Sequence, residues 1–217
     1  MPFLLLVLAL FIGPITNILW LSVSEPKLGL DNYQTLFISE SIPRILWTTL
    51  RVCSITTFFS VVFGYSIAFA MANLAANKRN LMLSLILISF WISVLVRTFS
   101  WLMLLGRSGV VNTTLETMGL ISEPITFMRN ELGVLIGMVH YMIPYAVLPI
   151  LASMQNIEQS LLSASRNLGA TKAQTFLRIY LPLTRPGLVG SSLLVFILSL
   201  GFYVTPAVLG GGKVLMV

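Results

Sequence analysis

Side chains that could do chemistry are few in this sequence, and they lie far apart along it. It contains one cysteine, one histidine and seven acidic residues. We find no Cys/His pair, no close pair of carboxylates and no His-Glu-x-x-His motif. The Gly-Gly-Gly-Lys run at 210–213 fails the phosphate-loop pattern, which would need glycine at Ala207 and a hydroxyl residue at Val214. We therefore predict no catalytic residue, no metal site and no cofactor, and we do not expect an enzyme.

The single cysteine and the single histidine both lie in apolar runs. We expect Cys53 to be a small buried core residue. His140 has no partner at metal-ligand spacing, which favours packing or a hydrogen bond between helices over a metal site.

The composition indicates an integral membrane protein built only from helices. Hydrophobic residues make up 57% and charged residues 9% of the chain, and its mean hydropathy is +0.94. A hydrocarbon layer about 30 Å thick needs roughly 20 helical residues. Five apolar runs meet this need: about 3–23, within 45–76, 81–105, about 132–154 and 187 to about 209. The first run has no basic residue before it and no clear cleavage site, so we expect a retained span rather than a signal peptide.

Glycine and proline predict where these spans bend or pack closely. Prolines fall within three spans, at Gly13-Pro14, Pro144, Pro149 and Pro206. Each removes a helical hydrogen bond, so each predicts a kink or an interruption. Gly133 and Gly137 have the spacing that permits close helix contact. A tight polar turn is predicted at 77–80, which would make the two flanking spans antiparallel neighbours.

Loop charges predict which side of the membrane each loop faces. With a cytoplasmic N-terminus, the inner loops hold six basic residues and one acid: Lys78, Arg79, Arg166, Lys172, Arg178, Arg185 and Glu158. The outer segments then hold five basic and six acidic residues: Lys27, Arg44, Arg107, Arg129, Lys213, Glu25, Asp31, Glu40, Glu116, Glu123 and Glu131. Basic residues concentrate in cytoplasmic loops. This asymmetry predicts a cytoplasmic N-terminus and accounts for the basic excess without nucleic acid as a partner.

The segment 163–182 is the longest stretch that is typical of a water-exposed helix. Gly169 predicts the end of a first short helix, because glycine accepts the left-handed conformation at a helix C-terminus. Thr171 and Gln174 form the pattern of a capping box that starts a second helix, and Leu181-Pro182 is predicted to stop it. Two interpretations remain open: an amphipathic hairpin on the inner leaflet, or a docking surface for a soluble partner.

This segment resembles the EAA loop of permease subunits in bacterial ABC importers. The matching residues are Ala164, Gly169, Ala170, Phe176, Ile179, Leu181 and Pro182, followed by Arg-Pro-Gly at 185–187. Ser163 and Ser165 depart from the pattern, since they stand where the family has glutamate and the second alanine. The missing glutamate removes a salt bridge that the pattern offers to an ATPase, but it leaves the turn unchanged. Stretches 29–37, 88–112, 142–162 and 199–211 resemble the spermidine/putrescine permease subfamily.

The resemblance implies a fold and a set of partners. The fold is the all-α membrane helix bundle of type I importer permeases (MetI-like), with a single permease domain over 1–217 and a cytoplasmic coupling loop at 156–185. Five spans are visible, and a sixth is expected past Val217, so the chain is expected to be truncated at its C-terminus. The partners are cytoplasmic ATP-binding subunits, a second and related permease, and an extracytoplasmic solute-binding protein. The expected location is the bacterial inner membrane, with polyamine or a similar small solute as cargo and with ATP bound by the partner.

The resemblance also implies site residues. The helix at about 158–169 would sit in a cleft of the ATPase and transmit its closure to the spans. The residues assigned to this coupling loop are Leu161, Ser163, Ala164, Arg166, Leu168, Gly169, Ala170, Thr171, Phe176 and Pro182.

Arg97 is interpreted as the only charge well inside a span, where it either snorkels to the outer headgroups or serves as a gate or pathway residue. Aromatic rings can stack on a cation, and the aromatic residues that could do so are Trp91, Trp101, Tyr141, Tyr145, Phe202 and Tyr203. Of these, Trp101, Tyr145, Phe202 and Tyr203 are the candidate pathway residues. Packing or a place in the interface belt is the alternative. The alternative to an importer permease is a self-contained carrier or channel. The lack of intramembrane acids argues against this alternative.

Overall fold

The computed structural model describes residues 2–25, 27–39, 41–212, 214 and 216. All regular secondary structure in these residues is helical, which confirms the predicted all-α class. The chain divides into two compact units, Met1–Ile45 and Leu46–Val217. A single permease domain over the whole chain stays a prediction. Of the charges used to orient the spans, Glu40 and Lys213 lie outside the described residues.

The first unit holds one long apolar helix and one short helix. α1 (Pro2–Ser24) runs as a single helix through Pro14. The Thr16 hydroxyl donates to Ile12 O and Gly13 O, at 2.8 and 2.9 Å. α2 (Asp31–Ile38) follows after a corner, where the Asn32 side-chain amide donates to Ser22 O at 2.9 Å.

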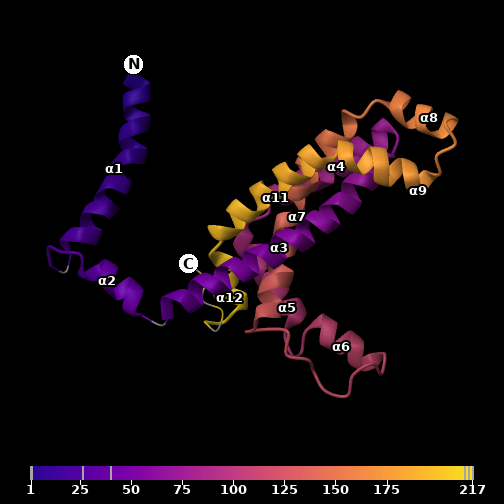
Figure 1. The fold of residues 1–217 in the computed structure, drawn as a ribbon. Helices are drawn as coiled ribbons and strands as arrows, with labels where there is room; N and C mark the ends of the chain where they lie inside the picture. The colour runs from indigo at the N-terminus through magenta and orange to yellow at the C-terminus, as the bar shows by residue number, and fades with distance from the viewer. Residues whose placement is uncertain (1, 26, 40, 213, 215, 217) are drawn as a thin grey trace. The chain divides into compact units, whose positions relative to one another are not determined.

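The second unit is a bundle entered by α3 (Ser41–Ala72), whose first residues belong to the first unit. The further helices are α4 (Ala76–Trp91), α5 (Val94–Leu105), α6 (Val110–Thr117), α7 (Glu131–Gln155), α8 (Gln159–Asn167), α9 (Lys172–Thr175), the π-helix η1 (Phe176–Tyr180), α10 (Leu181–Leu183), α11 (Arg185–Leu200) and α12 (Val204–Leu209). In Figure 1, α3, α7 and α11 run side by side, with α8 and α9 at one end of the unit and α5, α6 and α12 toward the other.

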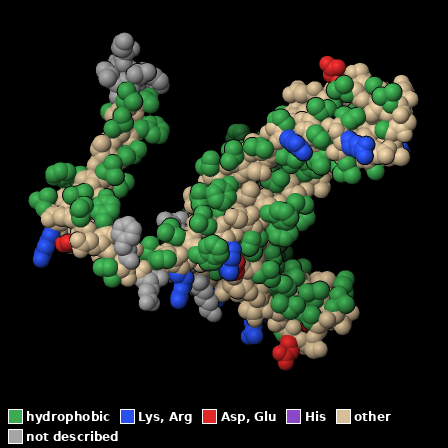
Figure 2. All heavy atoms as spheres, viewed as in Figure 1, with side chains coloured by type: hydrophobic (Ala, Val, Ile, Leu, Met, Phe, Trp, Pro, Cys, Tyr) green, Lys and Arg blue, Asp and Glu red, His purple; other side chains and the backbone are tan. Residues whose placement is uncertain are grey.

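Within the described residues, four helices are long and apolar enough to cross a membrane, or up to five if one bent pair counts as a single span. They are Leu6–Ser24, Ser41–Ala72, Val94–Thr117 and Glu131–Gln155, with Lys172–Leu183 and Arg185–Leu200 as the pair, bent by 56°. The polytopic architecture is therefore as predicted, and α7 continues through Pro144 and Pro149 as one helix. Apolar side chains cover much of the visible flank of the bundle, as a membrane-facing surface requires (Figure 2).

Small residues on α7 and its neighbours permit the closest helix contacts. A Cβ added to Gly64 of α3 would lie 2.7 Å from Ala146 Cβ, and one added to Gly187 of α11 would lie 2.5 Å from Ser153 Cβ. Both distances are shorter than real carbon contacts, so both positions require glycine. α7 is thus the central helix, and its buried residues Met142, Val147 and Ile150 join the main core.

The two glycines on α7 that were predicted to permit close helix contact, Gly133 and Gly137, make different contacts. A Cβ at Gly137 would lie 2.5 Å from Leu209 Cδ1, which places α12 directly on this glycine. Gly133 instead faces the carbonyl of Phe127, 2.5 Å from its ideal Cβ position. Only Gly137 therefore makes a contact between helices.

Two predicted boundaries are wrong. Residues 77–80 are not a turn: they form the first part of α4, and the turn lies at 73–75. The third span is broken at Ile92-Ser93, where Ile92 is extended and no glycine or proline gives a signal. The fifth span is interrupted near Pro206, as predicted: the break lies at 201–203, and Pro206 is in the first turn of α12.

Leu181-Pro182 does not stop the second helix of the 163–182 segment. α9 passes through η1 and α10 into the bend at Thr184, where α11 begins. Pro182 has no N–H, and its ring would clash with the carbonyl four residues before it. The wider π turn, closed by Leu181 N–H donating to Phe176 O, lets the helix continue across the proline.

Candidate functional sites

The turn between α8 and α9 has the geometry that the sequence predicts. Gly169 has φ of +84°, in the left-handed region that glycine adopts at little cost. Its N–H donates to Arg166 O at 2.9 Å, and Ala170 N–H donates to Ser165 O at 3.1 Å. These two bonds form a Schellman motif, which satisfies carbonyls at the end of α8.

The start of α9 is the predicted capping box. Gln174 N–H donates to Thr171 Oγ1 at 3.2 Å, and Thr171 N–H donates to Gln174 Oε1 at 2.9 Å. The two helices are therefore joined by a turn in which both helix ends are capped.

α8 has one face against the bundle and one face that is open. Leu162 and Ser165 are buried, and the Ser165 hydroxyl lies 2.9 Å from the hydroxyl of Thr175. Leu168 is 88% exposed and Leu161 is 46% exposed. The other candidate residues on the open side are Ser163, Ala164, Arg166, Gly169 and Thr171, with Ala170 half-buried. An exposed leucine at the tip of a hairpin is available for contact with a partner.

Phe176 holds the hairpin to the bundle. Its ring lies 5.5 Å from Phe69 and 6.4 Å from Tyr65, both edge-on, and it stacks on Tyr180 at 5.9 Å. Such aromatic pairs add to the stability of buried contacts. Phe176 therefore packs against the bundle, Pro182 is half-buried in α10, and the exposed contact surface is on α8.

A second cluster lies inside the bundle, around Tyr141 of α7. Phe202 lies 4.4 Å from the Tyr141 ring and Tyr145 lies 5.9 Å from it, measured between centroids. The Arg97 guanidinium carbon is 4.8 Å from the same ring. The structure thus brings together three of the five predicted pathway residues, and Tyr141 is the residue at their centre.

Arg97 also donates hydrogen bonds to backbone carbonyls at the break in the third span. Its guanidinium donates to the carbonyls of Ser89 and Ile92, which lie at the end of α4. Carbonyls at a helix end have no partner within the helix, and inside a membrane they need one. Arg97 therefore has partners in the bundle for its charge, which argues against snorkelling to the outer headgroups. A role as a gate or pathway residue stays a prediction.

Trp101 and Tyr203 make other contacts than the ring contacts described around Tyr141. The Trp101 indole N–H donates to His140 Nδ1 at 3.2 Å, and the two rings also pack edge to face, so His140 shows both of the predicted alternatives, packing and a hydrogen bond between helices. Tyr203 is 70% exposed. Cys53 is buried, as predicted.

Sequence reasoning missed an ion pair between two spans. Arg51 of α3 pairs with Glu131, the first residue of α7. Arg51 lies ten residues into the 32-residue α3, so it is a charge within a spanning helix that sequence reasoning did not name. The interpretation of Arg97 as the only charge well inside a span stays a prediction. A single basic residue within an apolar run, together with an acid at the start of a later span, was the available signal.

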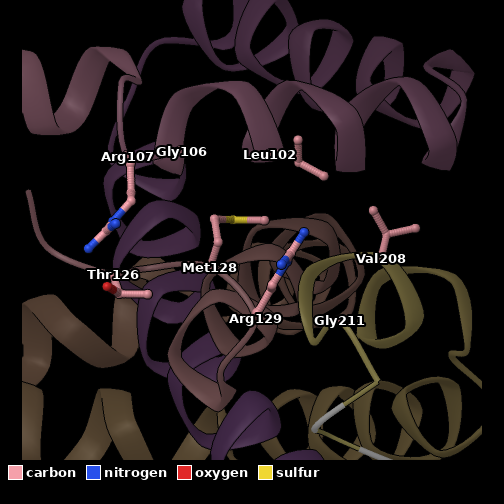
Figure 3. Close-up of a pocket in the computed structure, with 8 residues that line it drawn as sticks. All are labelled: Leu102, Gly106, Arg107, Thr126, Met128, Arg129, Val208 and Gly211. Atoms are coloured by element: carbon pink, nitrogen blue, oxygen red, sulfur yellow. The ribbon is translucent and has the colours of Figure 1, made fainter.

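Sequence reasoning also missed a cavity at the end of the unit opposite α8. It encloses about 760 Å³ and is lined by Arg107, Thr126, Arg129 and residues of α5 and α12 (Figure 3). Arg129 has φ of +58°, unusual for a residue with a side chain, and its N–H donates to Leu209 O at 2.9 Å. Gly211 leaves room for it, since a Cβ there would lie 2.7 Å from Arg129 Cγ.

Comparison with known proteins gives relatives over most of the chain. Residues 60–217 match the family described as binding-protein-dependent transport system inner membrane component. The spermidine/putrescine transport system permease protein PotB of Haemophilus influenzae is 36% identical over 188 residues, 87% of this chain and 65% of that protein. The Escherichia coli K12 protein of the same name is 35% identical over 188 residues, 87% of this chain and 68% of its own length. The chain thus spans about two thirds of the length of these relatives.

A solved structure has the same fold. A bacterial ABC transporter involved in the import of the acidic polysaccharide alginate superposes with a TM-score of 0.73 at 21% sequence identity. The match covers 100% of this chain and 75% of that chain. The importer-permease fold and the resemblance to spermidine/putrescine permeases are both confirmed.

Proposed function

Because the chain belongs to the family of binding-protein-dependent transport system inner membrane components, we propose that it forms the membrane pathway of an ATP-driven importer. It is a multi-pass inner-membrane transport subunit and not an enzyme. In the proposal, the hairpin of α8 and α9 docks on a cytoplasmic ATP-binding subunit. The observation that carries this role is the capped turn at Gly169, which joins an exposed α8 to a second helix that continues through η1 and α10 to α11.

The coupling step follows from that continuity. Closure of the ATPases on ATP would move α8, and the turn and the contact of Phe176 with Phe69 would pass the movement to the spans as a rigid body. The wall of the pathway would include Arg97, Tyr145 and Phe202 around Tyr141, with Trp101 and Tyr203 as further candidates. We propose that the hairpin and the N-terminus are both cytoplasmic. The loops on the side of the hairpin hold six basic residues and one acid, and this excess of basic residues supports the orientation.

The solute we propose is a polyamine such as spermidine or putrescine, as the names of the relatives suggest. Aromatic faces suit a flexible cation. With no acid among the residues of the Tyr141 cluster, a solute-binding protein outside the membrane would do most of the selection. One solved relative is in complex with a periplasmic protein. We further propose a related second permease beside this chain.

Reconstitution tests the proposal. The chain is co-expressed with the proteins encoded beside it, purified and placed in proteoliposomes, and uptake of labelled spermidine is measured with and without ATP. ATP-dependent uptake that also needs the solute-binding protein is the expected result. Uptake without an ATPase would instead indicate a self-contained carrier or channel, and failure of any ATPase to co-purify would count against the docking role of α8.

A further inference from the structure

Two hollows at the base of the hairpin share Arg166 of α8 as part of their walls. The first encloses about 190 Å³ between the hairpin and the end of α3, and Lys172 also lines it. The second encloses about 370 Å³ between α8, the ends of α3 and α7 and the start of α4, and Arg79 also lines it. None of the described lining residues of either hollow is acidic. Three cationic side chains therefore lie around these hollows without a carboxylate to balance them.

Arg166 and Lys172 are available to a molecule from outside the chain. Both residues are exposed, and neither side chain makes a hydrogen bond or an ion pair with a described residue. The acidic residue nearest to them in sequence is Glu158, which lines neither hollow and accepts a hydrogen bond from Ser160 at 3.1 Å. The positive charge of this surface is thus not neutralised within the described residues.

Arg166 lies on a flank of α8 that a docked partner can reach. It follows the buried Leu162 by four residues and the exposed Leu161 by five, which places it about 40° and about 140° from them around the helix axis. The open surface of α8 therefore runs from Arg166 over Ser163 and Ala164, both exposed, to Leu161. A groove that encloses this surface would contact a cation at one edge and a leucine at the other.

A carboxylate carried by a protein is the group that fits these cations. The guanidinium of arginine binds a carboxylate through two parallel hydrogen bonds. A free anion would be held only weakly, because water screens exposed charges. A carboxylate on a docked protein is kept in place by the other contacts of the interface, so the same pairing becomes effective there. Leu168, which is 88% exposed at the end of α8, is available for such a contact.

We propose that Arg166 and Lys172 bind acidic side chains of the cytoplasmic ATP-binding subunit, with Arg79 adding positive charge in the second hollow. The proposal rests on the docking of α8 in the proposed function, and it adds the chemistry by which the partner is recognised. Ion pairs at one edge of α8 fix the register of the partner on the hairpin, since complementary charges orient an interface. Leu161 supplies the apolar contact at the other edge.

Binding measurements with the full chain test this contact. The chain is purified in detergent, and its Kd for the purified ATP-binding subunit encoded beside it is measured at low and at high salt. We expect R166Q/K172Q to raise the Kd about tenfold at low salt and by less at high salt, because ions screen exposed pairs. R178Q is the matched control, since Arg178 is exposed but lines neither hollow, and its Kd should not change. R166K/K172R keeps both charges and should keep the low Kd, which separates loss of charge from misfolding.

Crosslinking identifies the group that is bound. A carbodiimide joins a carboxylate to a lysine amine only where the two are in contact, so we expect an amide between Lys172 and an aspartate or glutamate of the ATP-binding subunit. R166K introduces a second amine, which should link to the same acidic segment. Mass spectrometry of the digested complex locates both products. A complex that forms but gives no amide from either position overturns the proposal.

The outcomes distinguish this contact from the docking of α8 itself. If R166Q/K172Q binds the ATP-binding subunit as tightly as the unchanged chain does, the acidic contact is wrong and the docking stands. If the unchanged chain does not bind that subunit at all, the docking role in the proposed function is wrong, and this contact with it. If inorganic phosphate raises the Tm of the chain alone and R166Q/K172Q removes the rise, a free anion is the occupant, which also overturns the proposal.

Discussion

The hydroxyl oxygens of Ser165 and Thr175 lie 2.9 Å apart, across the turn that joins α8 to α9. Both residues are buried, and the same Ser165 hydroxyl donates to Leu162 O at 2.9 Å. Ser165 stands where the EAA pattern has alanine, so this departure adds a hydrogen bond between the two helices of the hairpin.

Replacement of Ser165 by alanine should loosen the hairpin. Loss of the bond leaves the buried Thr175 hydroxyl without its partner, at a cost of about 1 kcal/mol. We expect amide hydrogen exchange in α8 to become about fivefold faster, since 1.4 kcal/mol corresponds to a factor of ten. Ser163→Ala is the control, because Ser163 is exposed on the same helix and its exchange should stay unchanged. Equal exchange in both variants would contradict the role of the bond.

Replacement of Gly169 by valine should abolish uptake while the protein stays in the membrane. A β-branched residue at φ of +84° is strained by about 1–2 kcal/mol, so the turn must rearrange and α8 loses its position. The matched control is Gly119→Val, which has φ of +69° and open space at its Cβ but lies outside the hairpin. Normal uptake by G169V in proteoliposomes would refute the coupling role, and equal loss in G119V would point to strain alone.

The hairpin was predictable from sequence because its signals are local. Gly169 and the Thr171–Gln174 box act within four residues, and the structure has both. The break at Ile92-Ser93 was missed because no glycine or proline marks it, and Arg97 stabilises the break from the next helix. The end of α4 therefore depends on contacts with the next helix, which the local sequence does not show.

For the candidate sites too, the sequence indicates single residues, but the contacts between distant residues come only from the fold. The sequence indicates Arg97 and the aromatic residues one by one, and the fold shows that Tyr141 is the ring that contacts Arg97, Tyr145 and Phe202. The Arg51–Glu131 pair joins residues 80 positions apart, so sequence spacing gave no measure of their distance.

Replacement of Gly64 by alanine should destabilise the bundle. The added Cβ would lie 2.7 Å from Ala146 Cβ, so α3 and α7 must separate, and overpacking of this kind costs about 1–3 kcal/mol. A lower Tm in detergent is expected. Gly190→Ala has open space around its Cβ, and removal of a helical glycine should keep or raise the Tm. If the two variants unfold at the same temperature, the contact is not as tight as described.

Neutralisation of Arg51 or Glu131 should lower stability by unequal amounts. The pair is partly exposed, with 48% and 30% of the two side chains accessible, so its coupling should not exceed about 1 kcal/mol. Glu131 also lies in the first turn of α7, where a negative charge adds about 0.3–1 kcal/mol. We therefore expect E131Q to lower the Tm more than R51Q, and the double variant to lower it by less than the sum. Additive effects in this double-mutant cycle would show that the pair does not interact.

Removal of the Arg97 charge should change how a cationic solute interacts with the proposed pathway. The guanidinium occupies the face of Tyr141 at 4.8 Å, and a second cation would meet both a filled ring face and a like charge. R97Q frees that face while its amide can still donate to the carbonyls of Ser89 or Ile92. We expect the KM for spermidine uptake in proteoliposomes to fall severalfold, because a cation–π contact contributes about 0.5–2 kcal/mol.

Two variants separate this effect from general damage to the bundle. R97K keeps the charge, so its KM should stay near that of the unchanged protein even if its kcat falls. R107Q removes a charge from the cavity of Figure 3, which is not part of the Tyr141 cluster. If the charge at Arg97 determines the KM for spermidine, R107Q should leave this KM unchanged. A KM that is the same in R97Q and R97K would mean that Arg97 only supports the break between α4 and α5, and that the solute does not pass its guanidinium.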